Sequence, residues 1–197
     1  MLIVGSQCRV PFEVRMYLNF AAESAVRQLW DEIGRCGITR RDSESHVRPH
    51  VTFAVYEDVS EAVFVQRLQI WAADVSPFVI TMPAIGVFCS DPSELFLSIT
   101  ATRELLNLHC GFHTTFKDLV WRPWAYYLPD CWTPHCTLAD HLSPSQTANA
   151  LEACLHVVSR ITGMVESVEL TRIHPEESSA SFELMGMHPL VDHPPQG

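Results

Sequence analysis

Hydrophobic and polar positions alternate along some stretches of the chain and recur at helical spacing along others. Residues 12–20, FEVRMYLNF, are typical of a strand, and residues 21–36 place Val26, Leu29, Trp30 and Ile33 on one helical stripe. Residues 50–56 alternate and are rich in β-branched side chains, which predicts a second strand. A helix over residues 60–75 follows, with Ser60 as its cap.

The rest of the chain repeats this alternation of strands and helices. The helix expected after Ser143 has a strong start signal, because a Ser cap is followed by Pro and, three residues after the cap, by Gln146. Residues 118–134 are aromatic and rich in proline, which predicts a long loop. The other expected elements are strands over 77–89, 93–100, 135–140, 164–174 and 180–186, helices over 103–117 and 143–160, an N-terminal segment 1–11 and a flexible tail 187–197.

The tetrapeptide Pro-His-x-Thr occurs twice, each time at the start of a predicted strand. It lies in RPHVTFAVYED, residues 48–58, and in TPHCTLADHL, residues 133–142. Strand, helix, loop, Pro-His-x-Thr strand, helix and strand run in the same order through residues 12–89 and 93–174. This order indicates an internal duplication. We therefore expect an α+β protein: residues 12–186 form one domain of two pseudo-symmetric lobes, with antiparallel-rich sheets lining a central cleft and helices outside.

The residue types of the repeated motif suit acid–base chemistry at a phosphate. Residues two apart on a strand share a face, so His50 with Thr52, and His135 with Thr137, are expected to face the cleft. Near neutral pH one imidazole can be a general base while the other, protonated, is a general acid. Threonine hydroxyls can donate to phosphate oxygens on which charge develops. This set needs neither a metal nor another cofactor.

The composition limits which binding partners and which cellular compartment we expect for the protein. The net charge of −10 and the pI of about 5.4 argue against a grip on long nucleic acid, but leave room for a nucleotide or short RNA. The seven cysteines form no CxxC pair and their number is odd, which favours a reducing cytoplasm over a disulfide framework. The N-terminus has no signal-peptide pattern, and no apolar stretch approaches a membrane span. We expect a cytoplasmic monomer.

Three further groups have two readings each. Arg48 is either a phosphate contact beside His50 or a surface arginine. The aromatic residues between Trp121 and Trp132 either stack on a base or fill the gap between the lobes. His109 and His113 lie four residues apart on an expected helix, which suits partly buried structural histidines better than a zinc site without an HExxH motif.

The two motifs PHVTF and PHCTL resemble the paired HxTx motifs of the two-histidine (2H) phosphoesterase superfamily. That superfamily includes bacterial 2′-5′ RNA ligase-like proteins and cyclic phosphodiesterases, and the resemblance extends over about residues 12–186. It implies that His50 and His135 are the catalytic acid–base pair and that Thr52 and Thr137 bind phosphate. The implied activity is a metal-independent phosphoesterase acting on a 2′,3′-cyclic phosphate or a 2′-5′-linked oligonucleotide, with 2′-5′ RNA ligation as the reverse reaction.

Two other functions remain open from the sequence. The first is a nucleotide- or RNA-binding module that keeps the site without physiologically important catalysis. The second, with less support, is a zinc-stabilised interaction protein built around His109 and His113.

Overall fold

The computed structural model describes residues 11–38, 47–157, 160–175 and 180–193. The expected N-terminal segment up to residue 10, most of the loop before the first motif, and the last four tail residues lie outside this part. In chain order the elements are β1 Phe12–Leu18, α1 Phe20–Arg35, β2 His50–Val59, α2 Glu61–Ala73, β3 Phe78–Met82, β4 Ala84–Phe88, β5 Ser93–Ser98, α3 Arg103–Phe116, β6 Val120–Pro123, the 3-10 turn η1 Ala125–Tyr127, β7 His135–Leu142, α4 Pro144–Leu155, β8 Ile161–Pro175 and β9 Ala180–Pro189.

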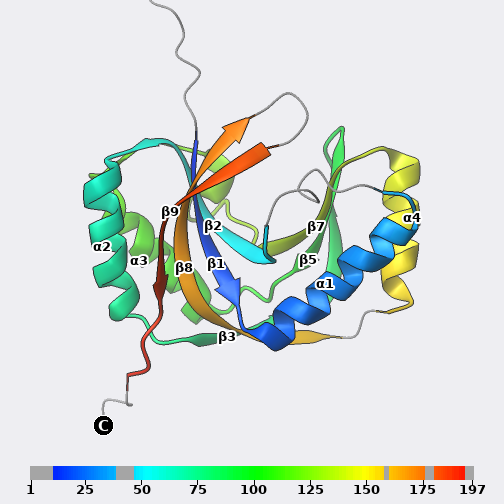
Figure 1. Ribbon diagram of the computed structural model, residues 1–197, viewed down its shortest axis with the longest axis horizontal. Helices are drawn as coiled ribbons and strands as arrows, with labels where there is room; N and C mark the ends of the chain where they lie inside the picture. The colour runs from blue at the N-terminus through cyan, green and yellow to red at the C-terminus, as the bar shows by residue number, and fades with distance from the viewer. Residues whose placement is uncertain (1–10, 39–46, 158–159, 176–179, 194–197) are drawn as a thin grey trace, which may run out of the picture.

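The strands form two antiparallel sheets, which confirms the expected α+β class. The first sheet has the order β3-β8-β1-β2-β6, with β9 also paired to β8. The second has the order β4-β5-β7. In Figure 1 the helices lie on the outside, with α2 and α3 at one end of the molecule and α1 and α4 at the other. The sheets with their motif strands β2 and β7 lie between them.

The two halves of the sequence exchange elements. Helix α1 packs with α4 beside the second sheet, where the Trp30 indole N–H donates to the Thr137 carbonyl of β7 over 3.2 Å. Helix α3 instead lies against the first sheet, where the Phe112 ring meets Phe53 of β2 at 5.2 Å between centroids. Strand β8, from the second half, pairs with β1. Each sheet, with the helices that cover it, therefore contains residues from both halves of the sequence.

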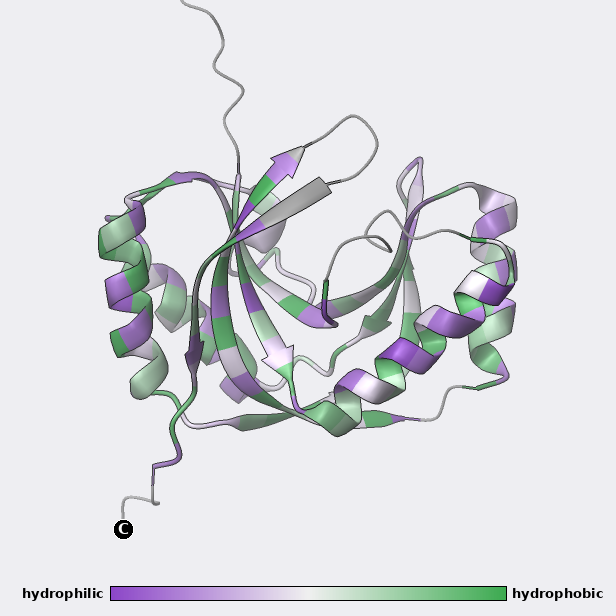
Figure 2. Cartoon of the chain, in the orientation of Figure 1, coloured by the Kyte–Doolittle hydropathy of each residue, from purple (hydrophilic) through white to green (hydrophobic). Residues whose placement is uncertain are grey.

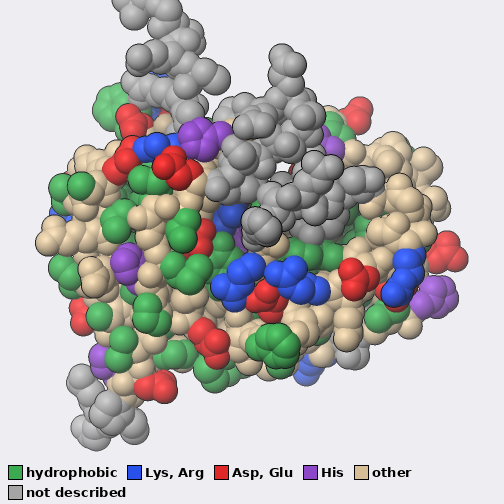
Figure 3. Space-filling view, viewed as in Figure 1, with side chains coloured by type: hydrophobic (Ala, Val, Ile, Leu, Met, Phe, Trp, Pro, Cys, Tyr) green, Lys and Arg blue, Asp and Glu red, His purple; other side chains and the backbone are tan. Residues whose placement is uncertain are grey.

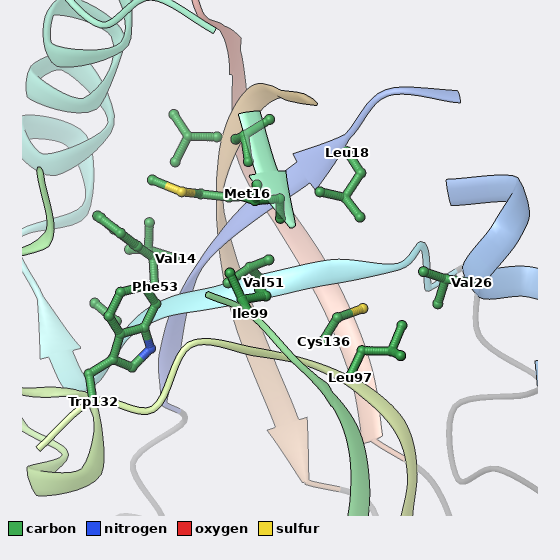
Figure 4. Packing of buried hydrophobic residues seen from close by; sticks show 14 of the residues in the cluster. Val14, Met16, Leu18, Val26, Val51, Phe53, Leu97, Ile99, Trp132 and Cys136 are labelled. Atoms are coloured by element: carbon green, nitrogen blue, oxygen red, sulfur yellow. The ribbon is translucent and has the colours of Figure 1, made fainter. Parts of the chain in front are cut away.

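The hydrophobic core is continuous from one sheet to the other. Figure 4 shows Val51 of β2 beside Ile99, Phe53 next to Trp132, and Leu97 near Cys136, and all six are buried. Along α1, apolar and polar residues alternate so that a polar stripe faces outward (Figure 2). The apolar residues of the motif strands, among them Leu138, belong to this core, which leaves the opposite face of each strand to its histidine and threonine.

Of the four α-helices in the described residues, three begin with a side-chain cap. Asn19, Thr102 and Ser143 each accept a backbone N–H of the first turn, and Gln146 completes the capping box expected at Ser143. Ser60 stands at the N-cap of α2, but its side chain makes no capping hydrogen bond, so that part of the expectation is wrong.

Some expected element boundaries differ from the structure. The strand expected over 77–89 is divided at Pro83 into β3 and β4, which belong to different sheets, because proline lacks the N–H that a ladder needs. The expected loop 118–134 contains β6, which pairs with β2, and η1. In the expected tail, Met187–Pro189 belong to β9, Leu190 is buried, and the Val191 N–H donates to the Val75 carbonyl.

Candidate functional site

Both motif strands carry a β-bulge at the same place. On β2, Thr52 pairs with Arg15 and Ala54 with Val14, which leaves Phe53 as the extra residue. On β7, Thr137 pairs with Phe96 and Ala139 with Leu95, which leaves Leu138 as the extra residue. Each bulge thus lies three residues after the motif histidine. A bulge shifts the alternation by one residue, so the histidine and threonine face the polar side while the following apolar residues return to the core.

The two imidazole rings are held in the same way. The Nδ1 atom of His50 lies 2.8 Å from the Arg48 carbonyl oxygen, and that of His135 lies 2.6 Å from the Thr133 carbonyl oxygen. A carbonyl can only accept, so Nδ1 carries the proton in both rings. Nε2 is then able to accept a proton when the ring is neutral and to donate one when it is charged. Nε2 is therefore the atom through which each ring can exchange a proton with a ligand.

A glutamate stands beside each pair of motif residues. The Thr52 hydroxyl donates to Glu13 Oε1, and His50 Nε2 lies 3.5 Å from the same oxygen. The Thr137 hydroxyl donates to Glu94 Oε1 over 2.7 Å, and His135 Nε2 lies 3.6 Å from that oxygen. We call Glu13, His50 and Thr52 the first cluster, and Glu94, His135 and Thr137 the second cluster. The duplication thus extends to a side chain outside the motif.

The first cluster continues into a buried polar network on β1 and β8. Arg15 is 3% exposed and forms an ion pair with Glu13, with Nη2 2.6 Å from Oε2. Burial alone would raise the pKa of the Glu13 carboxyl, but Arg15, His50 and Thr52 outweigh it and hold that pKa well below its usual range. Glu13 is therefore ionised throughout the neutral range. The network extends to β8, where Glu169 accepts from the hydroxyls of Tyr17 and Thr171.

Tyr127, in η1, is a neighbour of both clusters. Burial raises the pKa of its phenol, the negative charges of Glu13 and Glu94 raise it further, and its contact with the Thr52 hydroxyl acts in the opposite direction. Strands β2 and β7 also contact each other although they belong to different sheets. Tyr127 is therefore close enough to both clusters to be influenced by their carboxylates. The two clusters contain the four residues singled out from the sequence: His50, Thr52, His135 and Thr137.

Aromatic rings surround the histidines. The His135 ring packs edge-on against Phe88 and Phe96, at 5.0 and 5.3 Å between centroids, and the His50 ring packs against Tyr17 at 6.1 Å. The backbone of Gly86 lies so close to Phe96 that an added Cβ would come within 2.5 Å of its ring. Glycine at this position lets Phe96 lie flat on β4 next to His135.

Arg48 is held by contacts with side chains of α1 and β1. Arg48 pairs with Glu23 of α1 at 2.7 Å and lies over the Tyr17 ring, so its guanidinium is engaged beside the first cluster. In Figure 3, basic and acidic side chains are intermixed in the middle of the viewed face, in keeping with such ion pairs on α1.

The aromatic segment Trp121–Trp132 has both buried and exposed members. Trp132 is buried, and its indole N–H donates to the Thr52 carbonyl over 3.1 Å, which joins this segment to β2. Trp121, Trp124 and Tyr126 are exposed.

His109 is buried against Trp132, with 4.1 Å between ring centroids, and its Nε2 lies 3.1 Å from the Phe53 carbonyl oxygen. It is a structural histidine, and no metal-binding group of three side chains occurs among the described residues.

Sequence reasoning missed Glu13 and Glu94. The signal lies in the strand pairing. Each glutamate stands two residues before the strand partner of its threonine: Glu13 before Arg15, and Glu94 before Phe96. Residues two apart share a face, which brings both carboxylates to the motif side chains. Only the strand register reveals this relation, because the spacing from glutamate to histidine differs between the halves.

The interlocked two-sheet fold and its duplicated His/Thr clusters define the class of 2H phosphoesterases. The sequence model of the 2′-5′ RNA ligase superfamily matches residues 22–177, and the chain belongs to that superfamily. A search of curated protein sequences found no match. In the part of the chain that the structure describes, the helices are too short or too polar to cross a membrane.

Solved structures share the fold at low sequence identity. TT0787 of Thermus thermophilus is 15% identical, with a TM-score of 0.65 over 91% of this chain and 97% of that protein. Escherichia coli LigT in its apo form is 12% identical, with a TM-score of 0.63 over 93% of this chain and 98% of LigT. LigT complexed with 3′-AMP is likewise 12% identical, with a TM-score of 0.61 over the same shares.

Proposed function

We propose that the protein is a metal-independent phosphoesterase that cleaves a phosphodiester next to a ribose hydroxyl. The candidate substrates are 2′,3′-cyclic phosphates and short 2′-5′-linked oligonucleotides. The observation that supports this most strongly is the matched hydrogen bonding of His50 and His135: each Nδ1 atom is held by a backbone carbonyl, and each Nε2 atom lies 3.5 or 3.6 Å from a glutamate oxygen. Matched imidazoles can act as base and acid on one phosphate.

Hydrolysis of a cyclic phosphate requires two proton transfers: one from the attacking water to a base, and one from an acid to the departing ribose oxygen. The neutral imidazole accepts a proton from water through Nε2 while the water oxygen forms a bond to phosphorus. The charged imidazole donates its Nε2 proton to the ribose oxygen whose bond to phosphorus breaks. The product is a phosphomonoester, and the two rings have exchanged protonation states. With the 5′-hydroxyl of a second ribose in place of water, the same steps in the same direction form a bond from O5′ to phosphorus, break the bond from phosphorus to O3′, and give a 2′-5′ linkage.

The threonines bind the phosphate oxygens in this proposal. A hydroxyl has a single proton, and in the structure Thr52 gives it to Glu13 and Thr137 gives it to Glu94. Binding of substrate therefore turns each hydroxyl from the carboxylate to a phosphate oxygen. Two donors on one phosphate stabilise the charge that grows on its oxygens in the transition state.

The size of the substrate is limited by charge. The net charge of −10 opposes binding of long RNA, so a mononucleotide or a short oligonucleotide suits the site. LigT, which shares the fold, has been crystallised with phosphate and with 3′-AMP. Exposed Trp121, Trp124 and Tyr126 offer ring faces on which a base can stack.

A substrate panel tests the proposal. Purified protein is assayed with the four 2′,3′-cyclic nucleotides, with 2′-5′ and 3′-5′ dinucleotides, and with a phosphomonoester, each with and without excess EDTA. We expect hydrolysis of a cyclic or 2′-5′ substrate at the same rate in EDTA, because the residues of the two clusters supply acid, base and oxyanion contacts. Binding without turnover of any substrate would favour a nucleotide-binding module. Activity that EDTA abolishes and a divalent ion restores would contradict the metal-independent mechanism.

A further inference from the structure

The two glutamates stand in equivalent positions, which points to a shared task. Each accepts the hydroxyl of a motif threonine, and each lies 3.5 or 3.6 Å from the Nε2 atom of a motif histidine. Each stands two residues before the partner of that threonine on the neighbouring strand. The site that receives a phosphate is therefore bordered by a carboxylate on both sides.

Carboxylates at these positions change which phosphate the site accepts. A phosphodiester carries one negative charge at neutral pH, whereas a phosphomonoester carries about −1.5 to −2 because its second pKa is near 6. Each protonated histidine is partly neutralised by its glutamate, so the attraction for an anion is weaker than that of two free imidazolium ions. The second charge of a monoester is therefore opposed by two carboxylates a few ångströms away.

We propose that Glu13 and Glu94 are specificity-determining residues that make the site accept a singly charged phosphodiester and disfavour a doubly charged phosphomonoester. Hydrolysis turns the first kind of anion into the second. The product gains a negative charge at the moment it forms, and the carboxylate pair promotes its release. This inference rests on the proposed function for its biological meaning, but the charge selection itself is a property of binding.

The surroundings of the two glutamates fit this role. The ion pair with buried Arg15 keeps Glu13 ionised and also offsets part of its charge, so Glu94 contributes the larger share of the repulsion. Glu94 has 30% of its side chain exposed, so it can release Thr137 to a phosphate oxygen at little cost. The carboxylates are thus both temporary acceptors for the threonine hydroxyls and fixed negative charges.

The test compares two ligands that differ by one charge and cannot be turned over. These are 2′-deoxyadenosine 3′-monophosphate and its methyl ester, which lack the neighbouring hydroxyl that a transesterification needs. Dissociation constants are measured by calorimetry at pH 7.5 for the wild type, Glu94→Gln and Glu13→Gln. Glutamine keeps an oxygen that accepts the threonine hydroxyl and removes the charge. Glu152→Gln is the matched control, because it removes one negative charge from the exposed face of α4.

We expect the wild type to bind the methyl ester more tightly than the monoester. In each cluster variant the ratio of the two dissociation constants should shift by about tenfold in favour of the monoester, while the control keeps the wild-type ratio. Using the ratio cancels any change in histidine charge that affects both ligands alike. Glu94→Gln is the decisive variant, since Glu13→Gln removes the ion pair of a buried arginine.

The outcomes separate this inference from the proposed function. A ratio in folded Glu94→Gln within twofold of the wild type overturns the inference, even if the enzyme hydrolyses cyclic phosphates. A shifted ratio in a protein that hydrolyses nothing on the substrate panel supports the inference and contradicts the proposed activity. If neither nucleotide binds the wild type or Glu94→Gln, the inference is wrong.

Discussion

At the scale of single residues, the two motif threonines offer a matched test of the site. Replacing Thr52 or Thr137 with Val keeps the branched shape that suits a strand and removes the hydroxyl. Loss of a hydrogen bond to a charged group should lower kcat/KM by roughly tenfold to a hundredfold in each variant. Wild-type kcat/KM in either variant would contradict a role for that threonine in binding phosphate.

The same two variants should differ in stability. Thr52→Val removes a donor from the buried Glu13 carboxylate, so the free energy of unfolding should fall by about 1–3 kcal/mol. Glu94 is more exposed and can turn to water, so Thr137→Val should cost less. Urea unfolding of both variants measures the difference.

His109 gives a prediction for the dependence of stability on pH. Burial, followed by the charge of nearby His113, lowers its pKa from 6.5 to about 4, although the Phe53 and Tyr127 carbonyls act in the opposite direction. Between these two values the unfolded chain binds more protons than the folded one. The contribution of His109 to stability is therefore present above about pH 6.5 and is lost as the pH falls towards about 4. His109→Phe, which keeps a ring against Trp132, should flatten this part of the curve of unfolding free energy against pH. An unchanged slope would contradict the assignment.

At the scale of elements, two serines at helix starts allow a direct comparison. Ser143 caps α4 through a complete capping box, whereas the side chain of Ser60 makes no capping bond to α2. Ser143→Ala should lower the free energy of unfolding by about 1 kcal/mol, and Ser60→Ala by a smaller amount. Equal losses in thermal or urea unfolding would show that the capping hydrogen bond contributes little.

The order of the elements could largely be predicted from the sequence, and the differences have local causes. Periodicity identified α1 and α3 through their apolar stripes, and the start signal at Ser143 identified α4. The division at Pro83 could have been predicted, since proline removes a donor from the ladder. The strand β6 could not, because the four residues VWRP are too few to show alternation and they depend on β2 for their partners.

At the scale of the whole molecule, the repeated motif explains why the sequence singles out four candidate residues but not the arrangement around them. The repeated Pro-His-x-Thr identified His50, Thr52, His135 and Thr137, since a strand fixes which residues share a face. The hydropathy pattern could not predict that α1 packs beside the second sheet and α3 against the first. Both sheets offer an apolar face of the same kind. The glutamates escaped notice because their relation to the threonines exists only across paired strands.

The central claim is that His50 and His135 act together on one phosphodiester. The measurement is kcat/KM on the best 2′,3′-cyclic or 2′-5′ substrate for the wild type, His50→Ala, His135→Ala and the double variant, with folding checked by circular dichroism. Each single variant should lose about 10²–10⁴-fold, because each removes one proton-transfer partner. The double variant should lose much less than the product of the two, since residues that act as a unit are not additive. A folded double variant that keeps wild-type kcat/KM would contradict the paired-histidine mechanism.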